Sequence, residues 1–124
     1  MARTNLLFQS ATDGTLVVYK SIVENIAEKN PSDDYGNTPF HLAACLGHYD
    51  VCEIIIEHLW NTNPSNIDAV TPLHEAACQG HLKICSLIID HTKETDVEDN
   101  NGQTPKDLAK ENGHHEVVKL FDYQ

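Results

Sequence analysis

The stretch Thr38-Pro39-Phe40-His41-Leu42-Ala43-Ala44-Cys45-Leu46-Gly47-His48 decides the fold of this chain. It returns 33 residues later as Thr71-Pro72-Leu73-His74-Glu75-Ala76-Ala77-Cys78-Gln79-Gly80-His81. Four glycines keep the same spacing along the chain: Gly14, Gly47, Gly80 and Gly113. A register that holds over so many positions indicates an internal repeat.

The repeat divides the 124 residues, after a short leader, into units 5–37, 38–70, 71–103 and a shorter last unit, 104–124. Each unit predicts a short helix, a turn, a longer helix and a loop. In the second unit, Thr38 is a suitable N-cap and Pro39 suits the first helical position. Gly47 ends the short helix in a left-handed conformation, and a longer helix is expected from about Tyr49 to Leu59. The chain is therefore predicted to be all-α.

The two stretches also carry a family resemblance, because their shared pattern Thr-Pro-x-His-x-Ala-Ala-x-x-Gly-His resembles the ankyrin-repeat signature. The resemblance covers nearly the whole chain. It implies one domain, residues 1–124, built as a solenoid of four stacked helix-turn-helix units with projecting loops, here called fingers. It also implies protein–protein binding on a concave face made by the fingers and the short helices, with no catalytic residues.

The two end units depart from the pattern. The first unit lacks Thr-Pro, and the last has Lys106, Asp107 and Lys110 where the inner units have an apolar residue, a histidine and an alanine. A terminal unit has no neighbour on one side, so its outer face must be polar. We therefore expect both end units to be capping repeats of a complete four-repeat domain.

One finger also departs from the others. Ala69 stands where the neighbouring units have Gly36 and Gly102. Alanine is strained at a positive φ. We therefore expect the loop 66–70 to have a different shape from the other two fingers.

The composition narrows the choice of partners and compartments. The net charge of −11 argues against binding to nucleic acid or to anionic membrane surfaces. The N-terminus carries no secretory signal and no stretch approaches about 18 apolar residues. We therefore expect a monomeric cytoplasmic protein, with the nucleus as an alternative, whose four cysteines are free thiols.

Cysteine and histidine offer a candidate metal site, because Cys-x2-His-x3-Cys occurs twice, beginning at Cys45 and at Cys78. Thiolate and imidazole are zinc ligands. However, all four cysteines and seven of the eight histidines follow the 33-residue spacing, so the repeat itself explains the pattern. Cysteines at equivalent positions should lie about 10 Å apart, beyond the roughly 7 Å limit for a disulfide. We predict no metal, no cofactor and no disulfide between repeats.

Two further hypotheses, a functional role for the histidines and an enzymatic activity, have less support in the sequence. His41 and His74 resemble the family's structural histidine, which hydrogen-bonds between loop and helix, and a pH-sensing role stays open. No nucleophile-elbow, Walker, zinc-protease or dinucleotide motif occurs. The chain is therefore predicted not to be an enzyme.

Two hypotheses for function remain. The first is a protein-interaction module that binds a basic or mixed basic and apolar partner through the finger residues and the ends of the short helices. The second is a structural or engineered, consensus-like scaffold without a dedicated partner. For the first hypothesis, the predicted contact residues are Asp13, Asp34, Tyr35, Asn37, Leu46, Ile67, Asp68, Val70, Gln79, Asn100, Asn101 and Gln103.

Overall fold

The computed structural model describes residues 2–15, 19, 31–58 and 63–122. Within these ranges there are seven helices and no strands. In chain order the helices are α1 (Ala2–Asp13), α3 (Pro39–Leu46), α4 (Tyr49–His58), α5 (Pro72–Gln79), α6 (Leu82–Ile89), α7 (Pro105–Glu111) and α8 (His115–Asp122).

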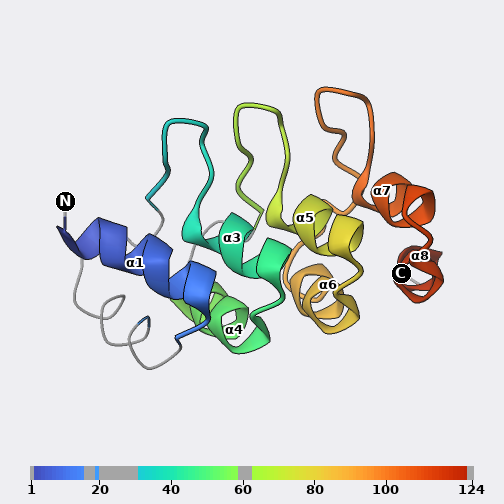
Figure 1. Ribbon diagram of the computed structural model, residues 1–124. Helices are drawn as coiled ribbons and strands as arrows, with labels where there is room; N and C mark the ends of the chain where they lie inside the picture. Colours follow the sequence, from blue (N-terminus) through green and yellow to red (C-terminus); the bar gives the residue numbers. More distant parts are fainter. Residues whose placement is uncertain (1, 16–18, 20–30, 59–62, 123–124) are drawn as a thin grey trace.

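The helices form two rows (Figure 1). Helices α1, α3, α5 and α7 lie side by side in the first row, and α4, α6 and α8 lie beneath them in the second. Three fingers project from the first row on the side away from the second (Figure 1). The prediction of an all-α solenoid with projecting loops is confirmed.

Helices α3 and α5 begin with a reciprocal cap. Thr38 is extended (φ −101°), and its Oγ1 accepts from the His41 N–H at 3.3 Å. In return, the Thr38 N–H donates to His41 Nδ1 at 3.1 Å. Thr71 and His74 make the same pair of bonds. These bonds satisfy donors that the first turn of a helix otherwise leaves unpaired.

The core lies between the two rows. Ala43 and Ala44 are fully buried in α3, as are their counterparts in α5. Their small side chains let neighbouring helices approach closely, while Val51, Ile55 and equivalent residues of the second row fill the space beneath. Cys45 lies on α3 and Cys52 on α4, as the glycine between them predicted.

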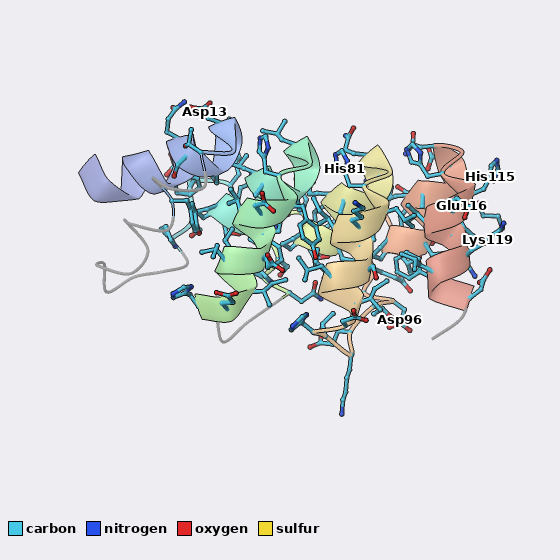
Figure 2. All side chains as sticks on the ribbon, turned by 90° about the horizontal axis from the view of Figure 1, so that it is seen from below. Asp13, His81, Asp96, His115, Glu116 and Lys119 are labelled. Carbon is cyan, nitrogen blue, oxygen red and sulfur yellow. The ribbon has the colours of Figure 1, made fainter. Side chains whose placement is uncertain are left out.

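A histidine from each later repeat joins it to the repeat before. The Nε2 of His48, His81 and His114 lies 2.8, 3.0 and 3.0 Å from the carbonyl oxygens of Thr12, Cys45 and Cys78, respectively. We assign these contacts to neutral imidazoles that donate from Nε2. Figure 2 shows His81 at the turn before α6.

Each of these rings rests on a glycine of the preceding repeat. A Cβ at Gly14 would lie 2.5 Å from the His48 ring, and one at Gly80 would lie 2.6 Å from the His114 ring. Any other residue would displace the imidazole. The repeating Gly-His dipeptide is therefore the joint between units.

In each finger, one side chain holds the turn by accepting two backbone hydrogen bonds. Asp33 Oδ1 accepts from the backbone N–H groups of the residues two and four positions further on, both at 2.9 Å. Asn66 and Asp99 do the same in the second and third fingers. These three residues thus have a structural role in the turns, which Asx side chains commonly adopt.

The expectation of a differently shaped second finger is wrong. Ala69 adopts φ 61°, close to the 79° of Gly36 and the 76° of Gly102. Its N–H donates to the Asn66 carbonyl at 3.0 Å, the bond that both glycines make in their own fingers. The hydrogen bonds of the turn therefore hold alanine in a left-handed conformation that costs about 1–2 kcal/mol.

The last repeat replaces the histidine cap with a carboxylate. The Thr104 N–H donates to Asp107 Oδ2 at 3.0 Å, and Thr104 Oγ1 accepts from the Asp107 N–H. Lys106 pairs with Asp122 at 2.5 Å, and Lys110 is exposed.

Two further expectations from the sequence concern the lengths of the helices. Helix α4 ends at His58, and Leu59 falls outside the described residues. Among the helices that the structure describes, none is long and apolar enough to cross a membrane.

Candidate functional site

The finger tips are linked into one strip. The Ile67 N–H of the second finger donates to the Tyr35 carbonyl of the first at 3.0 Å. The Asn100 N–H of the third finger donates to the Asp68 carbonyl of the second at 2.9 Å. These bonds hold the three tips in a fixed order. We call the tips 33–37, 66–70 and 99–103, together with the last residues of α1, α3 and α5, the finger surface.

Large apolar side chains are exposed on this surface. Tyr35 is 65% exposed, Ile67 is 63% exposed and Leu46, at the end of α3, is 49% exposed. Tyr35 and Ile67 are neighbours because their backbones are bonded at the tips. The sequence predicted all three residues for this surface. Exposed polar side chains that the sequence also predicted surround them: Asp34, Asp68, Gln79 and Asn101.

Other predicted contact residues use their side chains in hydrogen bonds within the protein. Asn37 Oδ1 accepts from Asn66 Nδ2 at 2.8 Å, and Asn100 Nδ2 donates to the Ile67 carbonyl at 3.1 Å. Gln103 Nε2 donates to Glu111 Oε2 at 2.6 Å.

Two further predicted contact residues also make hydrogen bonds within the protein. Asp13 accepts from Gln9 Nε2 at 2.8 Å, and the carbonyl of half-buried Val70 lies 2.7 Å from His41 Nε2. Five of the predicted contact residues therefore make hydrogen bonds within the fold, although Asp13 and Asn100 among them are also exposed.

The first two fingers lie in a stretch of the chain whose charged residues have one sign. Residues 31–82 contain aspartates and glutamates but no lysine or arginine. Asp34 and Asp68 are exposed beside the apolar tips, and Glu75 on α5 is half-buried. The surface combines exposed apolar groups with carboxylates, which suits a partner with both apolar and cationic groups.

Glu75 is a residue that the sequence reasoning missed. It lies beside Cys45 of the preceding repeat. The signal was available, because Glu75 replaces the apolar Leu42 at the equivalent position of the unit before. A charge in place of an apolar residue on a repeat helix marks a position that is not part of the core.

The thiols near this surface are poor nucleophiles. Burial raises the pKa of Cys45 to about 11, with Glu75 adding to the effect, and burial also raises the pKa of Cys78. In the second row, burial raises the pKa of Cys52 and of Cys85 to about 12. Only a thiolate attacks or binds metal readily, so these groups stay inert near neutral pH. All four cysteines are free thiols.

Metal ligands do not converge within the described part of the chain, where no three histidine, cysteine, aspartate or glutamate side chains could hold an ion. The two Cys-x2-His-x3-Cys patterns are instead divided between helices, and their histidines lie in the joints. This geometry explains the pattern as a product of the repeat.

His41 and His74 connect each inner helix to the next finger. His41 Nε2 lies 2.7 Å from the Val70 carbonyl, and His74 Nε2 lies 3.0 Å from that of Gln103. The predicted hydrogen bond between loop and helix is present in both repeats. Burial lowers the pKa of each histidine, so the neutral ring that donates from Nε2 and accepts at Nδ1 is favoured.

Comparison with family models matches ankyrin repeats (3 copies) over residues 2–68 and 56–123. The chain belongs to the ankyrin-repeat family. Members of this family are generally protein–protein interaction modules and are typically non-catalytic. A search of curated protein sequences gives no match.

Proposed function

We propose that this chain is a non-catalytic adaptor that binds a basic, partly apolar segment of a partner protein across the finger surface. The observation that carries the proposal is the pair Tyr35 and Ile67, both mostly exposed and fixed side by side by the bond between their tips. Rigid, exposed apolar side chains are effective anchors, because little conformational entropy is lost when they bind.

Electrostatics supports a cationic partner. Asp34 and Asp68 flank the two anchors, and no lysine or arginine occurs from residue 31 to residue 82. Lysine or arginine on the partner would be drawn to these carboxylates, and the attraction would weaken as salt screens it. The net charge of −11 opposes polyanions such as nucleic acid as well as self-association. A cytoplasmic or nuclear location for this monomer fits its four free thiols.

Affinity capture followed by mass spectrometry tests the proposal. The immobilised chain should retain a protein that the Tyr35→Ala/Ile67→Ala variant does not retain, while a Lys93→Ala control, an exposed residue outside the finger surface, retains it. All three baits should have the same circular dichroism spectrum, because the replaced side chains are exposed. The retained protein should elute as salt is raised.

Two results would count against the proposal. Equal capture by the double variant would remove Tyr35 and Ile67 from the binding site. A bait that retains no specific protein would favour the second possibility, a repeat scaffold without a dedicated partner.

A further inference from the structure

Glu75 breaks the pattern of the first row of helices. The corresponding positions of the other three units hold Gln9, Leu42 and Leu108, so Glu75 is the one charged residue of this series. Leu42 and Leu108 are half-buried, and Glu75 is half-buried as well. A leucine here would remove apolar surface from water between neighbouring units, which a carboxylate does not do. A residue that breaks the packing rule of its own fold is expected at functional positions.

The place of Glu75 in the fold connects it to the finger surface. Glu75 lies in the first turn of α5, directly after the second finger, whose tip carries Ile67. Figure 1 shows α5 between α3 and α7, with this finger leading into it. Glu75 also lies near the thiols of Cys45 on α3 and Cys78 on α5. A segment that contacts both Ile67 and the end of α3 therefore comes close to Glu75.

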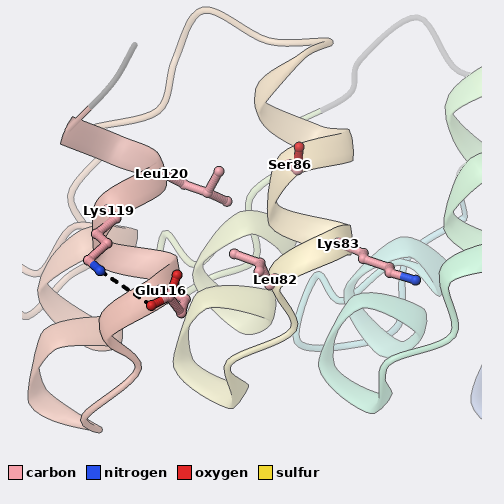
Figure 3. Close-up of a pocket in the computed structure, with 6 residues that line it drawn as sticks. All are labelled: Leu82, Lys83, Ser86, Glu116, Lys119 and Leu120. Carbon is pink, nitrogen blue, oxygen red and sulfur yellow. Dashed lines mark hydrogen bonds and ion pairs between the residues drawn. The ribbon is translucent and has the colours of Figure 1, made fainter.

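No cation neutralises this carboxylate within the part of the chain that the structure describes. The ion pairs found there join Lys106 to Asp122 and Lys119 to Glu116. Figure 3 shows the second of them, in which Lys119 Nζ lies 3.4 Å from Glu116 Oε1 on the second-row helix α8. Glu75 has no such counterpart, although it is half-buried.

The surroundings of Glu75 favour a cation that arrives with a partner. Burial raises the pKa of the Cys45 and Cys78 thiols, so these neighbours are uncharged near neutral pH. Glu111 of α7 also lies near Cys78 and carries the same sign of charge as Glu75. The first turn of a helix favours a negative group, because the helix dipole is positive there. When a bound segment excludes water, the effective dielectric falls and an ion pair with Glu75 becomes stronger.

We infer that Glu75 is the specificity-determining residue of the finger surface and that it pairs with one lysine or arginine of the partner segment. The inference rests on the proposed function, since it requires the segment to cross the finger surface. Apolar side chains of the segment lie against Tyr35 and Ile67, and the basic side chain reaches the base of the second finger. The partner is thus recognised by a basic residue at a fixed place relative to an apolar one. Asp34 and Asp68 are exposed and attract cations with less selectivity.

Peptide selection on the full-length protein tests the inference. A phage-displayed library of random linear peptides is selected on the immobilised wild type and on each variant. The wild type should enrich peptides with a lysine or arginine at one position relative to an apolar residue. Glu75→Gln should keep the apolar preference and lose the basic one, and Glu75→Lys should favour aspartate or glutamate at that position. Glu53→Gln, the same change at an exposed glutamate of α4, should select the wild-type pattern.

A double-mutant cycle measures the ion pair directly. The most enriched wild-type peptide is synthesised with its basic residue and with glutamine in its place, and calorimetry gives both dissociation constants. Against the wild type, the glutamine should weaken binding about tenfold, whereas Glu75→Gln should bind the two peptides within about twofold of each other. Asp68→Asn should weaken binding no more than about twofold and leave the difference between the two peptides in place.

A leucine variant controls for the fold. Glu75→Leu installs the residue that two other units have at this position, Leu42 and Leu108. It should therefore melt at a temperature no lower than the wild type, as followed by circular dichroism, and it should also lose the preference for a basic residue. A lower melting temperature together with an unchanged selection would assign Glu75 a structural role instead.

The outcomes separate this inference from the proposed function. A basic preference that persists in both Glu75→Gln and Glu75→Leu would overturn the role of Glu75 alone, because the finger surface would still bind the peptides. A wild-type selection without a shared pattern, or one that Tyr35→Ala/Ile67→Ala reproduces, would overturn the proposed binding site and this inference with it.

Discussion

His74 and Asp107 occupy the same position in neighbouring repeats, yet they connect their helices to different extents. Both accept a hydrogen bond from the backbone N–H of the capping threonine. The imidazole has a second nitrogen, and His74 Nε2 lies 3.0 Å from the Gln103 carbonyl at the base of the following finger. The Asp107 carboxylate can only accept hydrogen bonds, so it cannot donate one to a carbonyl as the His74 ring does.

The difference separates two roles that the family motif combines. The first ring nitrogen caps the helix, and the second connects that helix to the base of the finger that leads into the next unit. Asp107 keeps the first role and lacks the second. At this position each inner repeat has both a cap and a bond to the following finger, whereas the last repeat has the cap alone and is joined to its neighbour through His114.

The largest expected effect comes from removing an inner histidine. His74→Ala leaves the buried Thr71 N–H without a partner and removes one of the two hydrogen bonds to the Gln103 carbonyl, and it should lower the free energy of unfolding by about 2–4 kcal/mol. Asp107→Ala removes only a cap and should cost about 1 kcal/mol. Urea denaturation followed by circular dichroism measures both values.

The control for this comparison is His115→Ala, an exposed histidine that lies off the 33-residue spacing. It should change stability by less than about 0.5 kcal/mol. Equal losses for His74→Ala and Asp107→Ala would mean that the second nitrogen contributes nothing to the coupling.

The same comparison predicts a pH dependence. Burial lowers the pKa of His41 and of His74 from 6.5, so the folded state binds their protons less readily than the unfolded state does. Their contribution is therefore complete above pH 6.5 and is lost as the pH falls below it. Hydrogen bonds from Thr104 lower the pKa of Asp107 from 3.8, so its contribution is lost only at more acidic pH.

Thermal melts at a series of pH values test this expectation. The melting temperature of the wild type should fall as the pH drops from 6.5 towards 5. A His41→Gln/His74→Gln variant should be less stable at neutral pH and should show a weaker dependence over the same range. A wild-type profile that stays flat would contradict it and would also argue against any pH-sensing role.

A smaller change sharpens the comparison between the inner repeats themselves. Ala69→Gly relieves the left-handed alanine in the second finger and should raise the free energy of unfolding by about 0.5–1 kcal/mol. Gly102→Ala introduces the same strain into the third finger, where the new Cβ has room, and should lower it by a similar amount. Denaturant titration would refute this account if the two changes had the same sign.

The smallest effect is expected at the ion pair of the last repeat. Lys106 and Asp122 are both partly exposed, so Lys106→Gln should cost no more than about 1 kcal/mol. Lys93→Gln, outside this pair, serves as the control. The difference between the two variants should shrink in 0.5 M salt, at about which screening becomes strong, and a larger cost that salt leaves unchanged would point to packing instead.

The sequence was sufficient to predict the helices of the inner repeats, because each boundary is set by local chemistry. Thr38 caps, Pro39 begins and Gly47 ends the first of them, and all three lie where the repeat placed them. Tyr35, Leu46 and Ile67 were also predicted for the finger surface, and all three are exposed. They could be identified because they are apolar at positions outside the core-facing pattern.

Other features depended on hydrogen bonds that the sequence does not reveal. The shape of the second finger was predicted wrongly, because the Asn66 carbonyl of the same finger accepts from the Ala69 N–H and holds this residue in the conformation of glycine. The role of His48 was missed because its partner, the Thr12 carbonyl, lies in another unit.

The joint made by Gly80 and His114 has a consequence for how the chain could change in length. Each joint needs only a glycine, a carbonyl two residues before it and an imidazole one unit later. A duplicate of residues 71–103 inserted after Gln103 would carry all three, and it would present to Thr104 the same surface that the original presents now. Whole units are thus interchangeable parts, and the array can grow or shrink by one complete unit without redesign of the joints that remain.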